Sequence, residues 1–290
     1  MQFLVPLAPS LILLILCLAP TSAIAFIFRR ATRNKKPSLT TDFPRGPGQT
    51  RQTEIEEVTA DILTKTVIIP FIPLIIYSIL VAQCTLSPAR PGNAVISLYL
   101  IGTVAIIFSL CRDVWTLINR SNSLRLQVEG ERAVGQELSI LTAAGFRIFH
   151  DFPAPDFKID HLAVGPQGIF VIETTPTAKT KKEGQQKSTV QFDDEKLIPP
   201  GWGEKQPVQE AKDKSVWLEK WLEKSTGELH KTTAVIAVLG WAPDRAGSGR
   251  VKIYNGKDPA FLADGPIILN KSQIESVSLL VANKYHPQLP

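Results

Sequence analysis

The chain has 290 residues, of which 44% are hydrophobic, and this excludes a protein that is disordered throughout. Its net charge is +5, but residues 1–129 hold 12 basic and 7 acidic side chains, whereas residues 130–290 hold 20 of each. The positive excess therefore belongs to the first part of the chain, and it is not a sign of nucleic-acid binding. The three cysteines have unrelated spacings, which excludes a disulfide framework or a zinc site.

Three stretches are apolar and uncharged enough to span a membrane: residues 3–28, 66–83 and 94–110. The link LSPARPGN between the second and third predicts a tight turn, and hence a helical hairpin. A buried helix pair in a soluble protein is the alternative. Pro70 and Pro73 disfavour this alternative, because membrane helices tolerate proline better than soluble helices do.

The first apolar stretch is either an uncleaved anchor or a signal peptide that is cleaved after TSAIA. Cleavage would place the basic run that begins at Arg29 outside the cell, against the usual distribution of Lys and Arg, so an anchor is favoured. The same distribution predicts that residues 29–65 and the C-terminal domain lie in the cytoplasm. We therefore expect a multi-pass protein of the cell (inner) membrane, whose partner is the lipid bilayer.

The expected domains are an anchor at 1–28, a cytoplasmic loop at 29–65, a transmembrane hairpin at 66–111 and an α/β domain at 129–290. Within the loop, residues 54–64 predict a short amphipathic helix with Ile55, Val58 and Ile62 on one side. In the α/β domain we expect helices at 132–144, at 207–224 and after Asn270, where Gln273 completes a capping box. Strands are expected at 146–149, 157–164, 169–175, 189–192, 232–239, 251–254 and 266–269. The second of these helices is expected to bury Val208, Ala211, Val216 and Leu218.

The hairpin IDHLAVGPQGIFVIETT has a predictable register. Whether its turn has two or four residues, Asp160 faces Glu173 and Lys158 faces Thr175. Facing residues have Cβ atoms about 4.5–5.5 Å apart, so the two carboxylates repel unless a proton or a cation lies between them. Mg²⁺ suits such a pair, because it binds one or two carboxylates together with water and phosphate oxygens. The alternative is an acid that faces solvent or is neutralised by a nearby Arg or Lys.

Four stretches carry a family resemblance: GQELSIL, KIDHLAVGPQGIFVIETT, QPVQEAKDKSVWLEKWL and TTAVIAVL. Over about residues 130–240 the chain resembles the NERD family, the nuclease-related domain, a branch of the PD-(D/E)XK restriction-endonuclease-like superfamily. The resemblance implies an α/β (α+β) fold, with a mixed sheet flanked by helices after the transmembrane helices. It also implies Mg²⁺-dependent cleavage of DNA or RNA. Asp160 and Glu173 would be the metal ligands, Glu137 the helix acid and Gln209 the helix glutamine.

Thr175 departs from the family pattern, because it stands where the motif has a lysine. Loss of such a transition-state partner costs about two orders of magnitude in rate elsewhere. Lys158 faces Thr175 in the expected register and is predicted to supply the charge. Lys179, Lys181 and Lys182 are weaker candidates, since a loop positions charge poorly. The rival function is a catalytically degenerate domain that binds nucleic acid or a protein at the membrane. His161 is expected on the opposite face from Asp160, as a packing residue.

Overall fold

The computed structural model describes residues 45–86, 92–176, 189–193, 196–198, 207–239, 242–243 and 251–285. The expected anchor at 1–28 lies outside these residues. The chain divides into two compact units. The first contains Glu54–Ser123, and the second joins residues 45–53 to the part of the chain that starts at Leu124.

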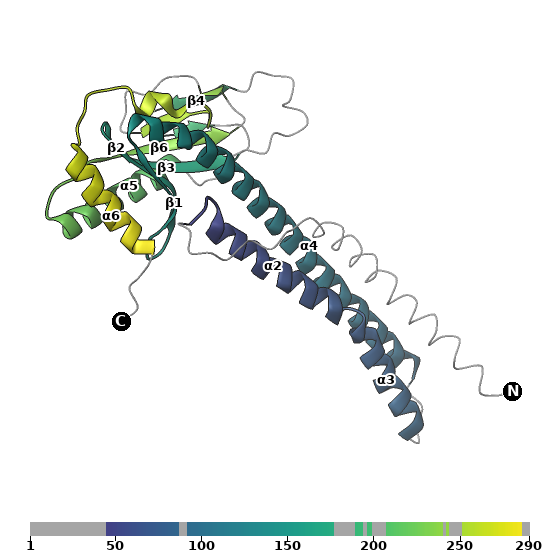
Figure 1. Cartoon of the computed structure of the whole chain (residues 1–290). Helices are drawn as coiled ribbons and strands as arrows, with labels where there is room; N and C mark the ends of the chain where they lie inside the picture. The colour runs from purple at the N-terminus through teal and green to yellow at the C-terminus, as the bar shows by residue number, and fades with distance from the viewer. Residues whose placement is uncertain are drawn as a thin grey trace. The chain divides into compact units, whose positions relative to one another are not determined.

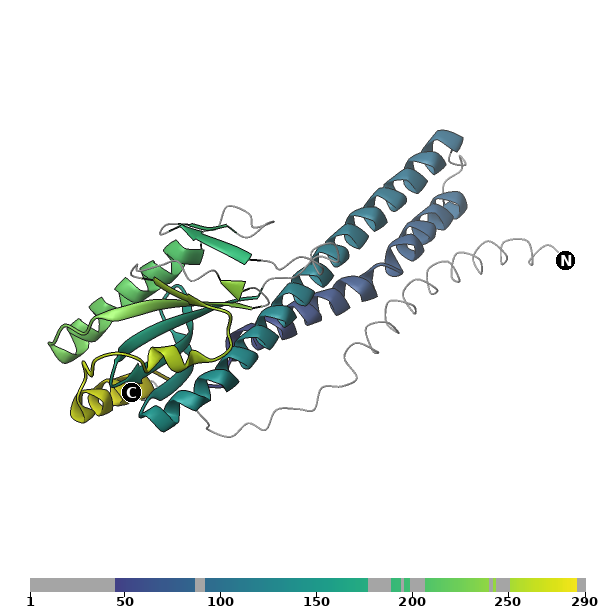
Figure 2. The same ribbon diagram turned by 90° about the horizontal axis from the view of Figure 1, so that it is seen from above.

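The first unit is built from α2 (Gln49–Ile68) after its first five residues, α3 (Phe71–Leu86) and the first part of α4 (Asn93–Leu138). As predicted, α2 buries Ile55, Val58 and Ile62, although the helix is longer than expected and begins at Gln49. Figure 2 shows α3 running beside α4, and the Gln83 Nε2 atom donates a hydrogen bond of 3.0 Å to the Tyr99 hydroxyl. This bond joins α3 to the first turns of α4.

Two helical stretches in this part of the chain, Gln49–Cys84 and Asn93–Ala144, are long and apolar enough to cross a membrane. They contain the second and third predicted spans. Pro70 lies in the short break between α2 and α3, and Pro73 lies in the first turn of α3. A proline is well tolerated there, because the first backbone N–H groups of a helix have no partner within the helix.

The second unit contains a five-stranded mixed sheet in the order β1-β2-β3-β6-β8. Its strands are β1 (Arg147–Pro153), β2 (Lys158–Gly165), β3 (Gly168–Pro176), β6 (Thr232–Leu239) and β8 (Val251–Tyr254). Strands β1, β2 and β3 are antiparallel neighbours, whereas β3, β6 and β8 are parallel. A smaller sheet contains β4 (Thr189–Asp193), β5 (Lys196–Ile198) and β7 (Ala242–Pro243). The mixed α/β class is as predicted.

Helices cover both faces of the large sheet (Figure 1). On one face, α5 (Pro207–Thr226) and α6 (Lys271–Tyr285) bury Leu218, Leu222 and Val277 against β1, β2 and β3. On the other face lie the end of α4, the 3₁₀ turn η1 (Ser139–Ala144) and η2 (Pro259–Leu262), packed around Leu138 and Leu262. The strands between these layers are apolar on both faces, as expected for the centre of such a sheet.

Several local predictions are confirmed. The β2–β3 ladder pairs Leu162 with Val171 and ends at Gly165 and Gly168, so the turn has two residues. Ahead of α6, Gln273 N donates to Asn270 Oδ1 at 2.9 Å, and Asn270 N donates to Gln273 Oε1 at 3.1 Å. This is the predicted capping box.

Residues 132–144 are helical and end at Gly145 as predicted, but the helix begins much earlier, because they are the end of α4 followed by η1. Two other local predictions are wrong. Residues 266–269 are not a strand, because the backbone N–H groups of Ile268 and Leu269 both donate to the Pro166 carbonyl. In α5, Val216 is exposed, whereas Lys214 is buried.

Candidate active site

Three acids lie at one level across neighbouring strands: Asp151 on β1, Asp160 on β2 and Glu173 on β3. We call these three residues the acid row. The pairs His150–His161 and Phe152–Ile159 set Asp151 opposite Asp160. On the other side of β2, the ladder extends from His161–Ile172 toward Asp160 and Glu173. The Thr174 backbone N–H donates to Asp160 Oδ2 at 3.0 Å and ties the two strands together at this level.

A fourth acid reaches this row from α4. Glu131 is 1% exposed, and its Oε2 atom lies 2.8 Å from the Lys158 ammonium. The same ammonium lies 3.0 Å from Asp151 Oδ1 and 3.3 Å from Asp160 Oδ1. One lysine therefore joins three buried carboxylates from a helix and two strands.

The charges in this cluster stabilise one another. Burial by itself would raise the pKa of Asp160, but Lys158 and Arg51 outweigh burial and hold that pKa below its ordinary value. Burial and repulsion from Asp160 raise the pKa of Glu131, against the attraction of Lys158 and Arg51. Burial also disfavours the charged form of Lys158, yet Asp160 and Glu131 raise its pKa above the usual value. Asp160 and Lys158 are therefore charged at neutral pH.

Glu173 has a cation of its own. The ammonium of Lys214, on α5, lies 2.5 Å from Glu173 Oε2, and both side chains are largely buried. Burial and the nearby charge of Asp160 raise the pKa of Glu173 to about 8, although Lys214 acts in the opposite direction. Glu173 therefore holds a proton easily at neutral pH, and a cation that binds it must displace that proton.

The comparison with protein families identifies this part of the chain. Residues 126–239 match the NERD family, described as the nuclease-related domain. The chain therefore contains a NERD domain. The matched range includes Glu131, Asp160, Glu173 and Lys214, and the mixed sheet is consistent with the PD-(D/E)XK superfamily. Comparison of the chain with curated proteins and with solved structures found no match.

The predicted site residues fall into two groups. Asp160 and Glu173 belong to the acid row, Lys158 lies beside it, and Thr175 lies half-buried on β3, paired with Val238 of β6. Lys158 pairs with Pro153 of β1, and its ammonium contacts Asp160. The lysine that contacts Glu173 is Lys214.

The other predicted residues lie elsewhere. Glu137 is half-buried on α4, where its charge acts on the Tyr254 hydroxyl and, with burial, raises the pKa of that tyrosine. Gln209 is exposed on α5 and donates to Asp213 Oδ1 at 2.8 Å. No described contact brings either residue to the acids. Lys179, Lys181 and Lys182 lie outside the described residues.

Sequence reasoning missed Glu131, Asp151, Arg51 and Lys214. For two of them a signal was present. Lys214 follows Ala211 by three residues and precedes Leu218 by four, so it stands on the buried stripe of α5. Glu131 precedes Val134 by three residues and Leu138 by seven, which places it on the buried stripe of α4. A charged residue within an apolar stripe was the indication in both cases.

The acid row contains oxygen atoms that suit a hard cation. Asp160 Oδ1 and Glu173 Oε1 are buried and accept no hydrogen bond from any residue that the structure describes. Mg²⁺ prefers such carboxylate oxygens, and water and phosphate complete its shell. Among the described residues, no group of three or more His, Cys, Asp or Glu side chains could hold an ion. The two carboxylates thus suit a cation that takes its other ligands from water or phosphate, and the described residues do not surround the ion.

His161 is fully buried, as expected for a packing residue. Its Nδ1 atom lies 2.8 Å from Nδ1 of His150, so one ring donates and the other accepts. Burial lowers the pKa of His161 to about 3 and also lowers that of His150. Two neutral rings fit this contact. The histidine pair lies next to Asp151 on β1 and Asp160 on β2.

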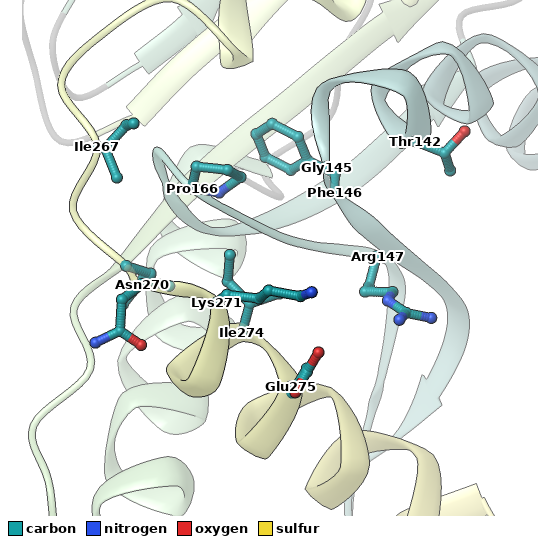
Figure 3. Close-up of a pocket in the computed structure, with 11 residues that line it drawn as sticks. Thr142, Gly145, Phe146, Arg147, Pro166, Ile267, Asn270, Lys271, Ile274 and Glu275 are labelled. Atoms are coloured by element: carbon teal, nitrogen blue, oxygen red, sulfur yellow. The ribbon is translucent and has the colours of Figure 1, made fainter.

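A separate pocket of about 680 Å³ lies at the other end of β2. It is lined by the start of β1, the β2–β3 turn and the first turns of α6. Figure 3 shows the side chains of Arg147, Lys271 and Glu275 around one space. Asp160 lies near the opposite end of β2, so this pocket is not part of the acid row.

Proposed function

We propose that the NERD domain hydrolyses phosphodiester bonds of DNA or RNA in a reaction that depends on Mg²⁺. The observation that carries this proposal is the Lys214 ammonium beside Glu173. The family motif places a lysine two residues after this acid, and the chain has Thr175 instead. Lys214 brings the missing positive charge to the same carboxylate from α5.

Each residue of the site has a role in this proposal. Asp160 and Glu173 would hold the metal through the two oxygen atoms that accept no hydrogen bond from the described residues. Bound Mg²⁺ would polarise the phosphate and activate water. Lys158 keeps Asp160 ionised, and Glu131 holds the Lys158 ammonium in place. Lys214 would orient the attacking water and stabilise charge that develops on the phosphate.

The second candidate is a domain that binds nucleic acid or a protein without cutting it. The observation in its favour is that Glu131, Asp151, Asp160 and Glu173 each lie within ion-pair distance of a lysine. A site whose acids are already neutralised has less need of a metal ion. Metal binding and cleavage distinguish the two candidates.

We also propose that the chain is a multi-pass protein of the inner cell membrane, with the NERD domain in the cytoplasm. Two apolar helical stretches of sufficient length support the membrane location. The concentration of Lys and Arg between residues 29 and 65 supports the orientation. The expected anchor at 1–28, loop at 29–65, hairpin at 66–111 and domain at 129–290 belong to this proposal.

The test is cleavage by the full chain in detergent, with DNA and RNA substrates, in Mg²⁺ and in a chelator. We expect cleavage that requires Mg²⁺ and that falls by about 100-fold or more in Glu173→Gln, because the metal loses a ligand. Glu210→Gln, the same change at an exposed position of α5, is the matched control and should cleave normally. Cleavage that survives in Glu173→Gln, or nucleic acids that stay intact in Mg²⁺, would contradict the proposal.

A further inference from the structure

A segment outside the matched domain reaches the acid row. Residues 45–53 belong to the same compact unit as the NERD domain, which begins at residue 126. Within this segment, Arg51 donates from Nε to Glu131 Oε1 and from Nη1 to Gln127 Oε1. Its Nη2 atom lies 3.6 Å from Asp160 Oδ1. Arg51 thus contacts both Glu131 and Asp160, as Lys158 does.

The backbone of this segment is fixed against the site. Thr50 donates twice to Asp151 Oδ2, from its backbone N–H at 3.0 Å and from its hydroxyl at 2.6 Å. Gly48 has φ of +77°, and an added Cβ there would come within 3.2 Å of Val128 Cγ1. Gln52 accepts a hydrogen bond of 2.7 Å from Arg132. Arg51 is therefore held at the acids by its neighbours as well as by its own charge.

Arg51 lies close to an oxygen that the proposed function assigns to metal binding. Asp160 Oδ1 accepts no hydrogen bond from a described residue, yet two cationic groups lie within 3.6 Å of it. A guanidinium keeps its charge at any physiological pH. A divalent ion at this oxygen would be repelled by that charge at short range, where protein screens charges poorly.

We infer that Arg51 is a positioning residue that serves as the resident counter-cation of Glu131 and Asp160 and weakens the binding of divalent metal at the acid row. The inference rests on the proposed function, because it concerns the same metal site. Arg51 holds the acids in place when no metal is bound, and a metal ion must overcome its repulsion. The first turn of α2 therefore sets how readily the NERD domain takes up metal.

The test is calorimetric titration of the full chain in detergent with Mn²⁺ and with Mg²⁺. Arg51→Gln removes the charge and keeps a hydrogen-bond donor, and we expect its metal affinity to rise about tenfold or more. Arg51→Lys keeps the charge and should stay within about threefold of the wild-type affinity. Arg147→Gln removes an exposed arginine at the far end of the sheet and is the matched control.

Unchanged or weaker metal binding in Arg51→Gln would overturn the inference, since a structural role predicts loss of affinity. If wild type and Arg51→Gln bind metal equally, the inference fails while the metal site of the proposed function stands. If neither binds metal, the inference fails, and the cleavage assay decides separately on the proposed function. Arg51→Met is a second variant without charge. If both variants fail to unfold cooperatively in a thermal scan, Arg51 is structural and the inference is overturned.

Discussion

At the scale of single residues, the proposed chemistry depends on which residue supplies a positive charge beside Glu173. We propose that Lys214 on α5 takes the place of the motif lysine on β3, and its ammonium lies 2.5 Å from Glu173 Oε2. It also lies 5.8 Å from the centre of the Phe157 ring, whose face favours a cation. Thr175 is two residues from Glu173 along β3, the position that the family motif gives to a lysine.

Replacement of Lys214 by methionine should destabilise the fold in a pH-dependent way. Loss of one partner of a buried ion pair typically costs about 3–5 kcal/mol. Glu173 can escape part of this cost by keeping its proton, so we expect a smaller loss in the free energy of unfolding at pH 6 than at pH 9. Urea unfolding of Lys214→Met at the two pH values measures the difference. Lys220→Met, at an exposed position of α5, is the control, and equal losses at both pH values would refute the pairing.

Glu173 should make the fold less stable as the pH rises. Its ordinary pKa is 4.5, and in the fold it is raised to about 8 by burial and by Asp160. Between these values the folded chain holds a proton that the unfolded chain has lost, so the free energy of unfolding decreases with pH. We expect Glu173→Gln to lose this decrease in metal-free buffer. Parallel stability curves for wild type and Glu173→Gln from pH 5 to pH 9 would show that the pKa is not raised.

At the scale of elements, local signals could be predicted and long-range positions could not. The register of β2 and β3 could be predicted from the turn, whether it has two or four residues, and the observed ladder from His161–Ile172 to Gly165–Gly168 keeps that register. The contact of Lys158 with Glu131 could not be predicted, because Glu131 comes from a helix that is distant in the sequence. Asp151 was missed for a similar reason: its role depends on a φ of +54° and on Thr50, 101 residues away.

The sequence did not predict where the helix before η1 begins, or that one apolar segment is not a strand. Residues 111–138 contain no proline, and Gly130 and Gly135 do not end the helix, so α4 continues to Leu138. Residues 266–269 have the apolar character of a strand, but the N–H groups of Ile268 and Leu269 donate to the Pro166 carbonyl of the β2–β3 turn. The lack of a stop signal therefore decided where α4 ends, and a tertiary contact decided residues 266–269.

The capping box ahead of α6 gives a prediction at this scale. Asn270→Ala removes the acceptor for the Gln273 N–H, and we expect it to lower the free energy of unfolding by about 1 kcal/mol. Asn270→Asp keeps an acceptor oxygen at the same place and should lose much less. Urea unfolding of the two variants measures the effect. Equal stability of wild type and Asn270→Ala would show that the cap does not contribute.

At the scale of the whole molecule, the sequence separates an apolar part from a charge-balanced domain. The apolar stretches of α3 and α4 expose large side chains such as Phe71, Leu98 and Phe108. Exposed apolar side chains in such number are costly in water and favourable in lipid. The Lys and Arg distribution supports the proposed orientation, and both the apolar stretches and this distribution could be read from the sequence alone.

The proposed orientation predicts the outcome of reporter fusions. A reporter inserted at Gly92, next to the turn of the hairpin, should report the outer side of the membrane. A reporter at the C-terminus should report the cytoplasm, because positively charged segments stay inside. Alkaline washing should leave the chain in the membrane fraction. Reporters on the same side, or release of the chain by the wash, would contradict the proposed topology.

The central claim is that Lys214 supplies the catalytic charge that Thr175 lacks, and single-turnover cleavage in Mg²⁺ tests it most directly. We expect Lys214→Met to cut nucleic acid about 100-fold more slowly than wild type, because a charge that stabilises the transition state is lost. The double variant Lys214→Met with Thr175→Lys returns a lysine to β3 and should recover at least about tenfold of that loss. A Lys214→Met protein that cuts at the wild-type rate would contradict the claim.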